Sequence, residues 1–224
     1  MKRQIIITSD GSNSIYVEDL KEHYHSIHGA IGESQHIFIQ SGLFSDNLKQ
    51  QQTLSILEIG FGTGLNALLT CFAAIETAQK IDYLTIEPCP LTDKEIKALN
   101  YADILPYPQV KEVFQRIHAA EWESNKSITD HFVITKRKLS ALDVILPNDH
   151  IDLVYFDAFS PEVQPELWTN VLFEKIFNSM KSHGVFVTYS TKGNVKRALK
   201  QTGFRIEKLP GPAGKREILR GFKY

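Results

Sequence analysis

The chain has 224 residues, of which 42% are hydrophobic and 23% charged, and its net charge at pH 7 is −1. This composition is typical of a folded globular domain and excludes a disordered or collagen-like chain. No run reaches the roughly 18 apolar residues of a membrane span, and the two cysteines, Cys71 and Cys89, are too few for a disulfide framework. We therefore expect a cytoplasmic protein with reduced cysteines and no membrane contact.

Apolar runs alternate with helical periodicities along most of the chain. Residues 1–52 are mixed and polar, and we expect them to form an N-terminal extension to a main domain at 53–224. Within the main domain, apolar runs predict strands at 54–59, 83–86, 131–135, 151–156, 184–189, 204–209 and 217–222. Helical spacing predicts helices at 65–78, 92–100, 167–180 and 195–201, and another ending near residue 122.

This alternation of strands and helices predicts an α/β fold. Strands that follow each other through helices form a parallel sheet with helices on both faces. The last two expected strands are joined only by the loop PGPAGK, which is too short for a parallel connection. We therefore predict a mostly parallel seven-stranded sheet with one late antiparallel strand.

A glycine-rich turn joins the first strand of the main domain to its helix. It reads Leu-Glu-Ile-Gly-Phe-Gly-Thr-Gly-Leu-Asn over residues 57–66, and glycine there allows close backbone approach to a ligand. Glu58 just before it disfavours a pyrophosphate and favours a cationic or zwitterionic ligand. Glu87 ends the next strand, where a carboxylate accepts the hydroxyls of a ribose. An ordinary tight turn is the alternative, but the combination favours a nucleoside cofactor.

Charge is distributed unevenly along the chain. Residues 192–224 contain ten basic and two acidic residues, so they carry +8 and the first 191 residues carry −9. A basic end on an acidic body suits a polyanion such as nucleic acid, although solvated faces of a last helix and strand explain it equally well.

Four stretches together resemble one family. LEIGFGTGLN resembles the S-adenosylmethionine loop of class I methyltransferases. With YHSIHGAIGESQHIF (24–38), DAFSPEVQPELW (157–168) and YSTKG followed by GFRIEKLPGPAGKREILRG (189–221), the chain resembles the MnmC-type methyltransferase domain. That family acts on 5-aminomethyl-2-thiouridine at the wobble position of tRNA. The resemblance implies a Rossmann-like fold, S-adenosylmethionine as cofactor, tRNA as substrate, and a stand-alone form whose FAD-dependent oxidase step comes from a separate protein.

The resemblance also implies roles for individual residues. The three loop glycines would line the methionine part of the cofactor, Glu58 would lie near its ammonium group and Glu87 would hold its ribose. Ser140 or backbone groups would contact the adenine, because no acidic residue follows the third strand. The expected cofactor-binding residues are Tyr24, Glu58, Gly60, Phe61, Gly62, Thr63, Gly64, Asn66, Glu87, Pro88, Ser140, Asp157 and Ala158. The expected substrate-binding and tRNA-binding residues are His25, Glu33, Ser34, Lys192, Lys196, Arg197, Lys215 and Arg216.

Asp157 and Phe159 are the expected catalytic residues. An alkylamine must be neutral to attack the methyl group, and its pKa of about 10.4 lies roughly 6.5 units above that of an ordinary Asp. The mismatch, about 9 kcal/mol, makes Asp157 a poor general base. We therefore expect Asp157 to accept an amine N–H bond and aim the lone pair, while the proton leaves to solvent. Phe159 is the candidate for stacking on the base. For Asp157 alone, a helix-capping carboxylate is the alternative.

Four histidines, His23, His25, His28 and His36, cluster near the N-terminus. Their spacing fits no standard zinc pattern, and amine methylation needs no metal, so we expect none. Trp168 and Cys71 are expected in the core. Three other functions stay open at this stage: a small-molecule amine methyltransferase, a non-catalytic nucleic-acid-binding protein on a similar fold and, more remotely, a nicotinamide oxidoreductase.

Overall fold

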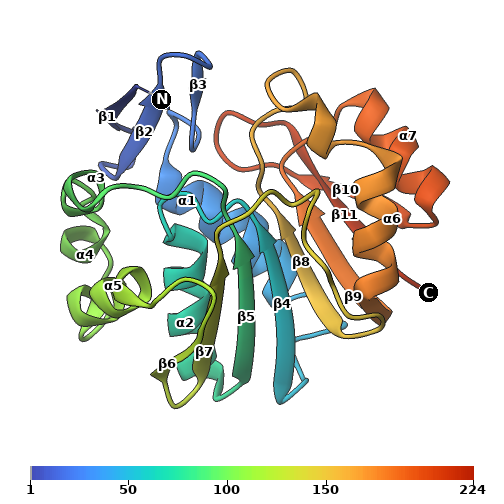
Figure 1. Cartoon of the computed structure of the whole chain (residues 1–224), viewed down its shortest axis with the longest axis horizontal. Coiled ribbons are helices and arrows are strands. Elements are labelled where there is room, and N and C mark those ends of the chain that lie inside the picture. Colours follow the sequence, from blue (N-terminus) through green and yellow to red (C-terminus); the bar gives the residue numbers. More distant parts are fainter. Residues whose placement is uncertain (1) are drawn as a thin grey trace.

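The computed structural model describes residues 2–224 (Figure 1). Its centre is an eight-stranded sheet in the order β10-β11-β9-β8-β4-β5-β7-β6. The strands are β4 (Thr53–Ile59), β5 (Lys80–Ile86), β6 (Asn125–Thr129), β7 (Phe132–Arg137), β8 (Ile151–Phe156), β9 (Met180–Thr188), β10 (Arg205–Pro210) and β11 (Glu217–Phe222).

The predicted fold class is confirmed. Strands β7, β5, β4, β8 and β9 run parallel, and β11 pairs antiparallel with both β9 and β10. All seven expected strands are present. The eighth, β6, was missed because its sequence NKSIT buries only Ile128. It pairs antiparallel with β7 at the sheet edge, where one-sided burial leaves no apolar run to detect.

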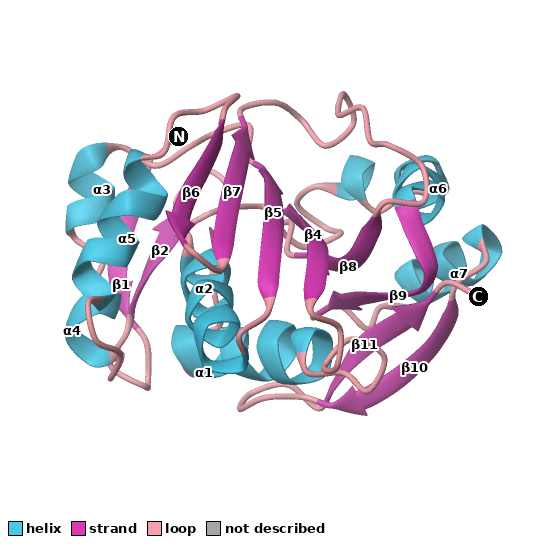
Figure 2. Ribbon diagram, turned by 90° about the horizontal axis from the view of Figure 1, so that it is seen from below, coloured by secondary structure: helices cyan, strands magenta, loops and turns pink. Residues whose placement is uncertain are grey.

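Helices cover both faces of this sheet (Figure 2). The helical elements are α1 (Ala30–Ser34), η1 (Gln35–Leu43), α2 (Leu65–Thr77), α3 (Asp93–Lys97), α4 (Tyr101–Ile104), α5 (Val110–Ala119), η2 (Pro165–Leu167), α6 (Asn170–Ser179) and α7 (Gly193–Thr202). Helix α3 begins with a capping box: the Thr92 side chain accepts the backbone N–H of Glu95, and the Glu95 carboxylate accepts the backbone N–H of Thr92. Gly203 ends α7 at a φ of 114°, a conformation that glycine adopts without strain. No helix within residues 2–224 has the length and apolar character to span a bilayer.

Two hydrophobic cores form because neighbouring strand residues point to opposite faces. Ile56 packs in one core with η1, α2 and α5, whereas Leu57 packs in the other with α6 and α7. Trp168 lies in the second core and Cys71 in the first, both buried as predicted.

The N-terminal segment divides into two parts. Strands β1 (Arg3–Ile7), β2 (Asn13–Val17) and β3 (Glu22–His23) form a separate antiparallel sheet. This sheet lies near the carboxyl ends of the central strands (Figure 1). Helix α1 instead packs into the first core through Ile31, and η1 through Ile37 and Phe38, so the extension shares the core of the main domain.

Candidate active site

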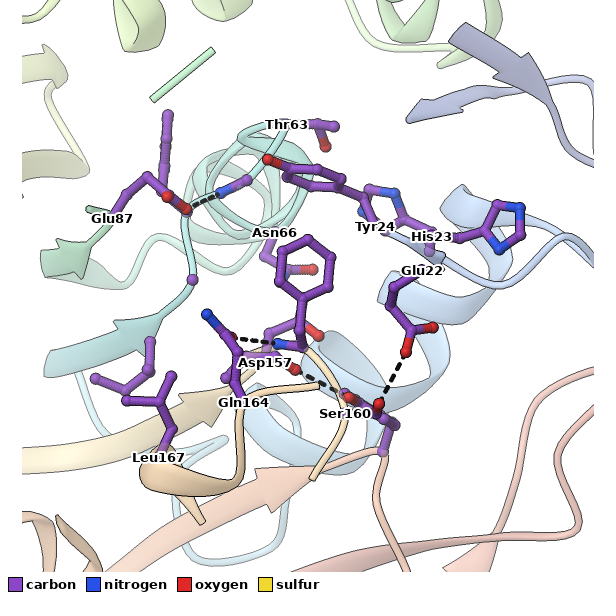
Figure 3. A pocket seen from close by; sticks show the side chains of 18 of the residues that line it. Glu22, His23, Tyr24, Thr63, Asn66, Glu87, Asp157, Ser160, Gln164 and Leu167 are labelled. Carbon is purple, nitrogen blue, oxygen red and sulfur yellow. Dashed lines mark hydrogen bonds between the residues drawn. The ribbon is translucent and has the colours of Figure 1, made fainter. Parts of the chain in front are cut away.

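A cavity of about 530 Å³ opens at the carboxyl ends of β4, β5 and β8. Strand β4 is the point where the chain order reverses, since β5 lies on one side of it and β8 on the other. Open α/β sheets bind their ligands at such a position. Figure 3 shows Tyr24, Glu87 and Asp157 reaching this cavity from three segments that are distant in sequence.

The glycine turn between β4 and α2 forms one wall. Gly60, Gly62 and Gly64 have φ angles of 95°, 51° and 74°, which side-chain-bearing residues rarely adopt. A Cβ on Gly60 would lie 2.6 Å from the carbonyl oxygen of Asp157. Gly60, Phe61, Gly62, Thr63 and Asn66 line the cavity. Gly64 does not: it is the N-cap of α2, so its role is to shape the turn.

Glu87 lies at the end of β5, where it was expected. Its Oε2 accepts the N–H of Gly62 at 3.1 Å and its Oε1 accepts the N–H of Cys89 at 2.8 Å. A carboxylate has about four acceptor positions, so two stay available for ribose hydroxyls. Burial raises the pKa of Glu87, and the two backbone donors oppose that shift. Pro88, next in the chain, also lines the cavity.

The structure corrects the expected position of Glu58. Its side chain is fully buried inside the sheet and accepts the hydroxyl of Thr85 at 2.7 Å, and it is not part of the cavity wall. Burial raises its pKa to about 8, so the carboxyl is largely neutral at pH 7. The reason is the alternation along β4, which places the Glu58 side chain on the same face of the sheet as Ile56, beside its cross-strand neighbour Thr85.

Asp157 follows β8 and faces the cavity. Its Oδ2 accepts the side-chain N–H of Asn66 at 2.9 Å, and its backbone N–H donates to Ile59 in β4. Burial, and then the charge of Glu33, raise the pKa of Asp157 to about 7. The ordinary value used in the sequence argument was therefore too low, and the mismatch with an alkylamine falls to roughly 3 units.

Phe159 is held in place by its neighbours. Its ring meets that of Tyr24 edge to face at 5.2 Å, and its backbone N–H donates to Gln164 at 3.1 Å. The indole N–H of Trp168 donates to the Phe159 carbonyl at 2.9 Å. Ala158 lines the cavity too, and its carbonyl accepts the hydroxyl of Tyr189. This loop is thus fixed by contacts that sequence reasoning did not identify.

Glu33 and Lys215 also line the cavity and form an ion pair of 2.5 Å. His25 lies beside them, and burial lowers its pKa to about 4, so its ring is neutral. Ser34 does not reach the cavity, because successive helical residues point about 100° apart and it faces the core instead. Ser140, expected near the adenine, lies on the wall after β7.

The other basic residues expected to bind tRNA lie outside the cavity. We call Lys192, Lys196, Arg197 and Arg216 the basic rim. Lys192 pairs with Glu162 in the loop after β8, and α7 begins just beyond it. A hydrogen bond from Lys208 lowers the pKa of Glu217, and the charges of Arg216 and Lys196 also lower it.

A buried lysine that the sequence analysis missed supports the glycine turn from behind. Lys136 donates to the carbonyls of Ile117 and His118 at 3.0 and 2.7 Å, and lies 5.5 Å from the Phe61 ring. His118 in turn contacts the carbonyl of Thr63 at 3.1 Å. A lysine in an alternating strand gives no sequence signal of such a role.

Across the described residues 2–224, no group of three or more His, Cys, Asp or Glu is arranged to hold a metal ion.

Comparison with known proteins identifies the family. Residues 95–224 match the family described as S-adenosyl-L-methionine-dependent methyltransferase. The chain belongs to this methyltransferase family. Curated relatives of the methyltransferase include the tRNA 5-methylaminomethyl-2-thiouridine biosynthesis bifunctional proteins MnmC of Burkholderia thailandensis and Nitrosospira multiformis, each 30% identical. The matches cover 88% and 94% of this chain, but only 32% and 35% of those relatives, so the methyltransferase spans about a third of their length.

Solved structures show the same fold. MNMC2 from Aquifex aeolicus matches all of this methyltransferase and 70% of its own chain, with a TM-score of 0.83 and 24% identity. Spermidine synthase from Thermotoga maritima matches all of it and 75% of its own chain, with a TM-score of 0.57 and 13% identity.

The cavity of the methyltransferase fits S-adenosylmethionine. The turn at Gly60 and Gly62 leaves no side chain between backbone and ligand, and Glu87 keeps acceptor positions free for a ribose. Carboxylates rather than cations dominate the wall, which suits a sulfonium and an ammonium group.

Proposed function

We propose that this methyltransferase methylates the exocyclic primary amine of 5-aminomethyl-2-thiouridine, or its 2-oxo form, at the wobble position of tRNA. The product is the 5-methylaminomethyl nucleoside. The observation that carries the proposal is the position of Asp157: it closes β8 beside the glycine turn, with the Phe159 ring next to it. The names of the curated relatives support the choice of nucleoside.

The chain's own residues have separable tasks in this reaction. When bound, S-adenosylmethionine supplies an electrophilic methyl group; Glu87, Gly60, Gly62 and Asn66 would hold it. Asp157 accepts an N–H bond from the substrate amine, and the Asn66 amide fixes the orientation of that carboxylate. Phe159 offers an aromatic face or edge to the wobble base. The proton leaves mainly to solvent, because Asp157 is still about 3 pKa units more acidic than the amine.

Recognition of tRNA is assigned to the basic rim. Lys192 precedes α7 and pairs with Glu162 in the loop after β8, Lys196 and Arg197 lie in α7, and Arg216 follows the cavity-lining Lys215 in the β10–β11 loop. Phosphate contacts position a nucleic acid without reading its sequence, so the rim would guide the anticodon loop toward the cavity. We further propose that an FAD-dependent oxidase acts on the same nucleoside, as the word bifunctional in the relatives' names suggests.

A labelling experiment tests the reaction. The protein is incubated with methyl-labelled S-adenosylmethionine and bulk tRNA from cells that lack this modification, and the digested nucleosides are separated. Label in a uridine bearing a methylaminomethyl group is expected. Label in another nucleoside, or none with wild-type protein that binds the cofactor, contradicts the proposal. Asp157→Asn serves as the catalytically impaired control.

A second experiment separates tRNA from a small-molecule amine substrate. Replacing Lys196, Arg197 and Arg216 by Gln should weaken tRNA binding and reduce the slope of log affinity against log salt by roughly 2 to 3. Lys49 precedes β4 and Lys80 begins β5, so both lie at the amino ends of these strands, away from the cavity, and replacing them by Gln is the control. A small-molecule enzyme would show no effect of the rim substitutions.

A further inference from the structure

Three ionisable side chains from distant parts of the chain line the cavity. They are Glu33 from α1, Asp157 after β8 and Lys215 from the β10–β11 loop, and all three line the wall. Lys215 Nζ lies 2.5 Å from Glu33 Oε1 and 5.2 Å from the centre of the Tyr189 ring. Both Glu33 and Lys215 are mostly buried, with side-chain exposures of 10% and 28%.

The oxygens of Glu33 are already occupied. Oε1 accepts Lys215, and Oε2 accepts the backbone N–H of Ser26 at 2.7 Å. Asp157 differs, since only its Oδ2 has a hydrogen-bond partner among the described residues, the Asn66 amide. Asp157 is therefore the carboxylate available to a substrate amine, and Glu33 acts on it through its charge. Glu33 raises the pKa of Asp157 and Lys215 lowers it, so the three groups are electrostatically coupled.

The rest of the wall is acidic or neutral. The N-terminal segment contributes Glu22, His23, Tyr24, His25 and His28, and Glu22 accepts the Ser160 hydroxyl at 2.8 Å. The later segments contribute Glu87 and Cys89 after β5, Glu166 in η2 and Tyr189 after β9. Among the described residues that line the cavity, Lys215 is the only lysine or arginine.

An acidic wall creates a difficulty for amine methylation. Neighbouring carboxylates favour the ammonium form of a bound amine, and that form has no lone pair for attack. A cation in the same place has the opposite effect and favours the neutral amine. We propose that Lys215 tunes the site electrostatically: by neutralising Glu33, it keeps the substrate amine in the neutral form that Asp157 orients.

This role rests on the proposed function and deepens it. Lys215 touches neither the methyl group nor the amine in this inference; it acts through Glu33. Its position on the β10–β11 loop, beside Arg216, also places this charge next to the basic rim. Lys215 was expected among the substrate-binding and tRNA-binding residues, and its ion pair with Glu33 places it on the cavity wall.

The test is the pH dependence of kcat with tRNA carrying 5-aminomethyl-2-thiouridine, at saturating cofactor between pH 6 and 9.5. In the wild type, kcat rises with pH as the bound amine loses its proton. Lys215→Met leaves the Glu33 charge uncompensated, so this rise should move to higher pH by about 1 unit. On the rising part of the profile, kcat should then be roughly tenfold below that of the wild type, and it should recover at high pH. Glu33→Gln should move it to lower pH. The double variant should return it to near the wild-type position.

Lys208→Met is the matched control, because Lys208 pairs with Glu217 at 2.7 Å on the same hairpin outside the cavity. It should leave the pH profile unmoved. A Lys215→Met variant whose kcat falls by the same factor at every pH has lost only structure, and the inference is then wrong. A double variant whose pH profile stays at the position found for Lys215→Met would also contradict the inference. Should Lys215→Met not fold, Glu33→Gln still tests the inference, because its rise of kcat should move to lower pH.

A measurement without turnover gives an independent readout. Calorimetric titration of tRNA into cofactor-free protein at pH 8, in two buffers of different ionisation enthalpy, reports the protons released on binding. The wild type should release more protons than Lys215→Met, and equal release would overturn the inference. Wild-type protein that produces no methylated nucleoside at any pH would instead refute the proposed function.

Discussion

Gly60 offers a sharp test of the active-site geometry, because a single methyl group there meets a rigid neighbour. In Gly60→Ala the new Cβ would lie 2.6 Å from the carbonyl oxygen of Asp157, at a φ of 95°. Gly11 has a comparable φ of 82°, but a Cβ there would meet nothing within 4 Å. The pair therefore separates the cost of the backbone conformation from the cost of the collision.

The expected magnitudes follow from these two terms. A side chain in the left-handed region costs about 1–2 kcal/mol, and both variants incur this cost. Overpacking against backbone adds about 1–3 kcal/mol in Gly60→Ala only. For a chain of this size 1 kcal/mol corresponds to about 2–4 °C in Tm, so Gly60→Ala should melt several degrees below Gly11→Ala.

Catalysis should respond more strongly than stability. The colliding atom belongs to Asp157, and a displacement approaching 1 Å at a reacting group costs about 100-fold in rate. We expect a loss of kcat of that order in Gly60→Ala and a change within about twofold in Gly11→Ala, measured by methyl transfer to tRNA and by thermal unfolding. Equal stability of the two variants, together with an unchanged kcat in Gly60→Ala, would refute the placement of Asp157 against the glycine turn.

Three further substitutions test the buried and charged groups of the site. Asp157→Asn should lower kcat about 100-fold, the loss expected when the reacting amine is no longer aligned, while calorimetry shows cofactor affinity within a few-fold of wild type; a near-normal kcat would show that Asp157 has no part in methyl transfer. Glu58→Gln should leave the cofactor Kd at pH 7 within about threefold, because burial raises the pKa of Glu58 to about 8 and leaves its carboxyl group mainly neutral. A tenfold weaker cofactor affinity would instead show that Glu58 contacts the ammonium group of the cofactor. Burial lowers the pKa of His118 to about 4, below its unfolded value of about 6.5, so the folded state resists protonation and stability should fall as pH drops from 6.5 to 4. His118→Gln should reduce that fall, by up to ~3 kcal/mol in urea unfolding, and an undiminished acid sensitivity would point to other groups.

Much of the site could be predicted from local sequence. The glycine turn, Glu87 and Asp157 each end a strand recognisable from its apolar run, and parallel strands bring their carboxyl ends to one edge. Those residues meet in the cavity as expected. The side-chain direction of Glu58 and Ser34 was harder to predict, because it depends on how each element packs against its neighbours.

The sequence by itself determined the order of the elements, the fold class and the glycine turn after β4, since these follow from periodicity and from glycine conformation over a few residues. Only the tertiary structure decided the charge balance of the cavity. Glu33 and Lys215 are 182 residues apart and become partners because the β10–β11 loop reaches α1 across the sheet edge. The pKa of Asp157 likewise depends on burial, which no local pattern reports. Charges act through space and solvent exclusion, and both are properties of the folded chain.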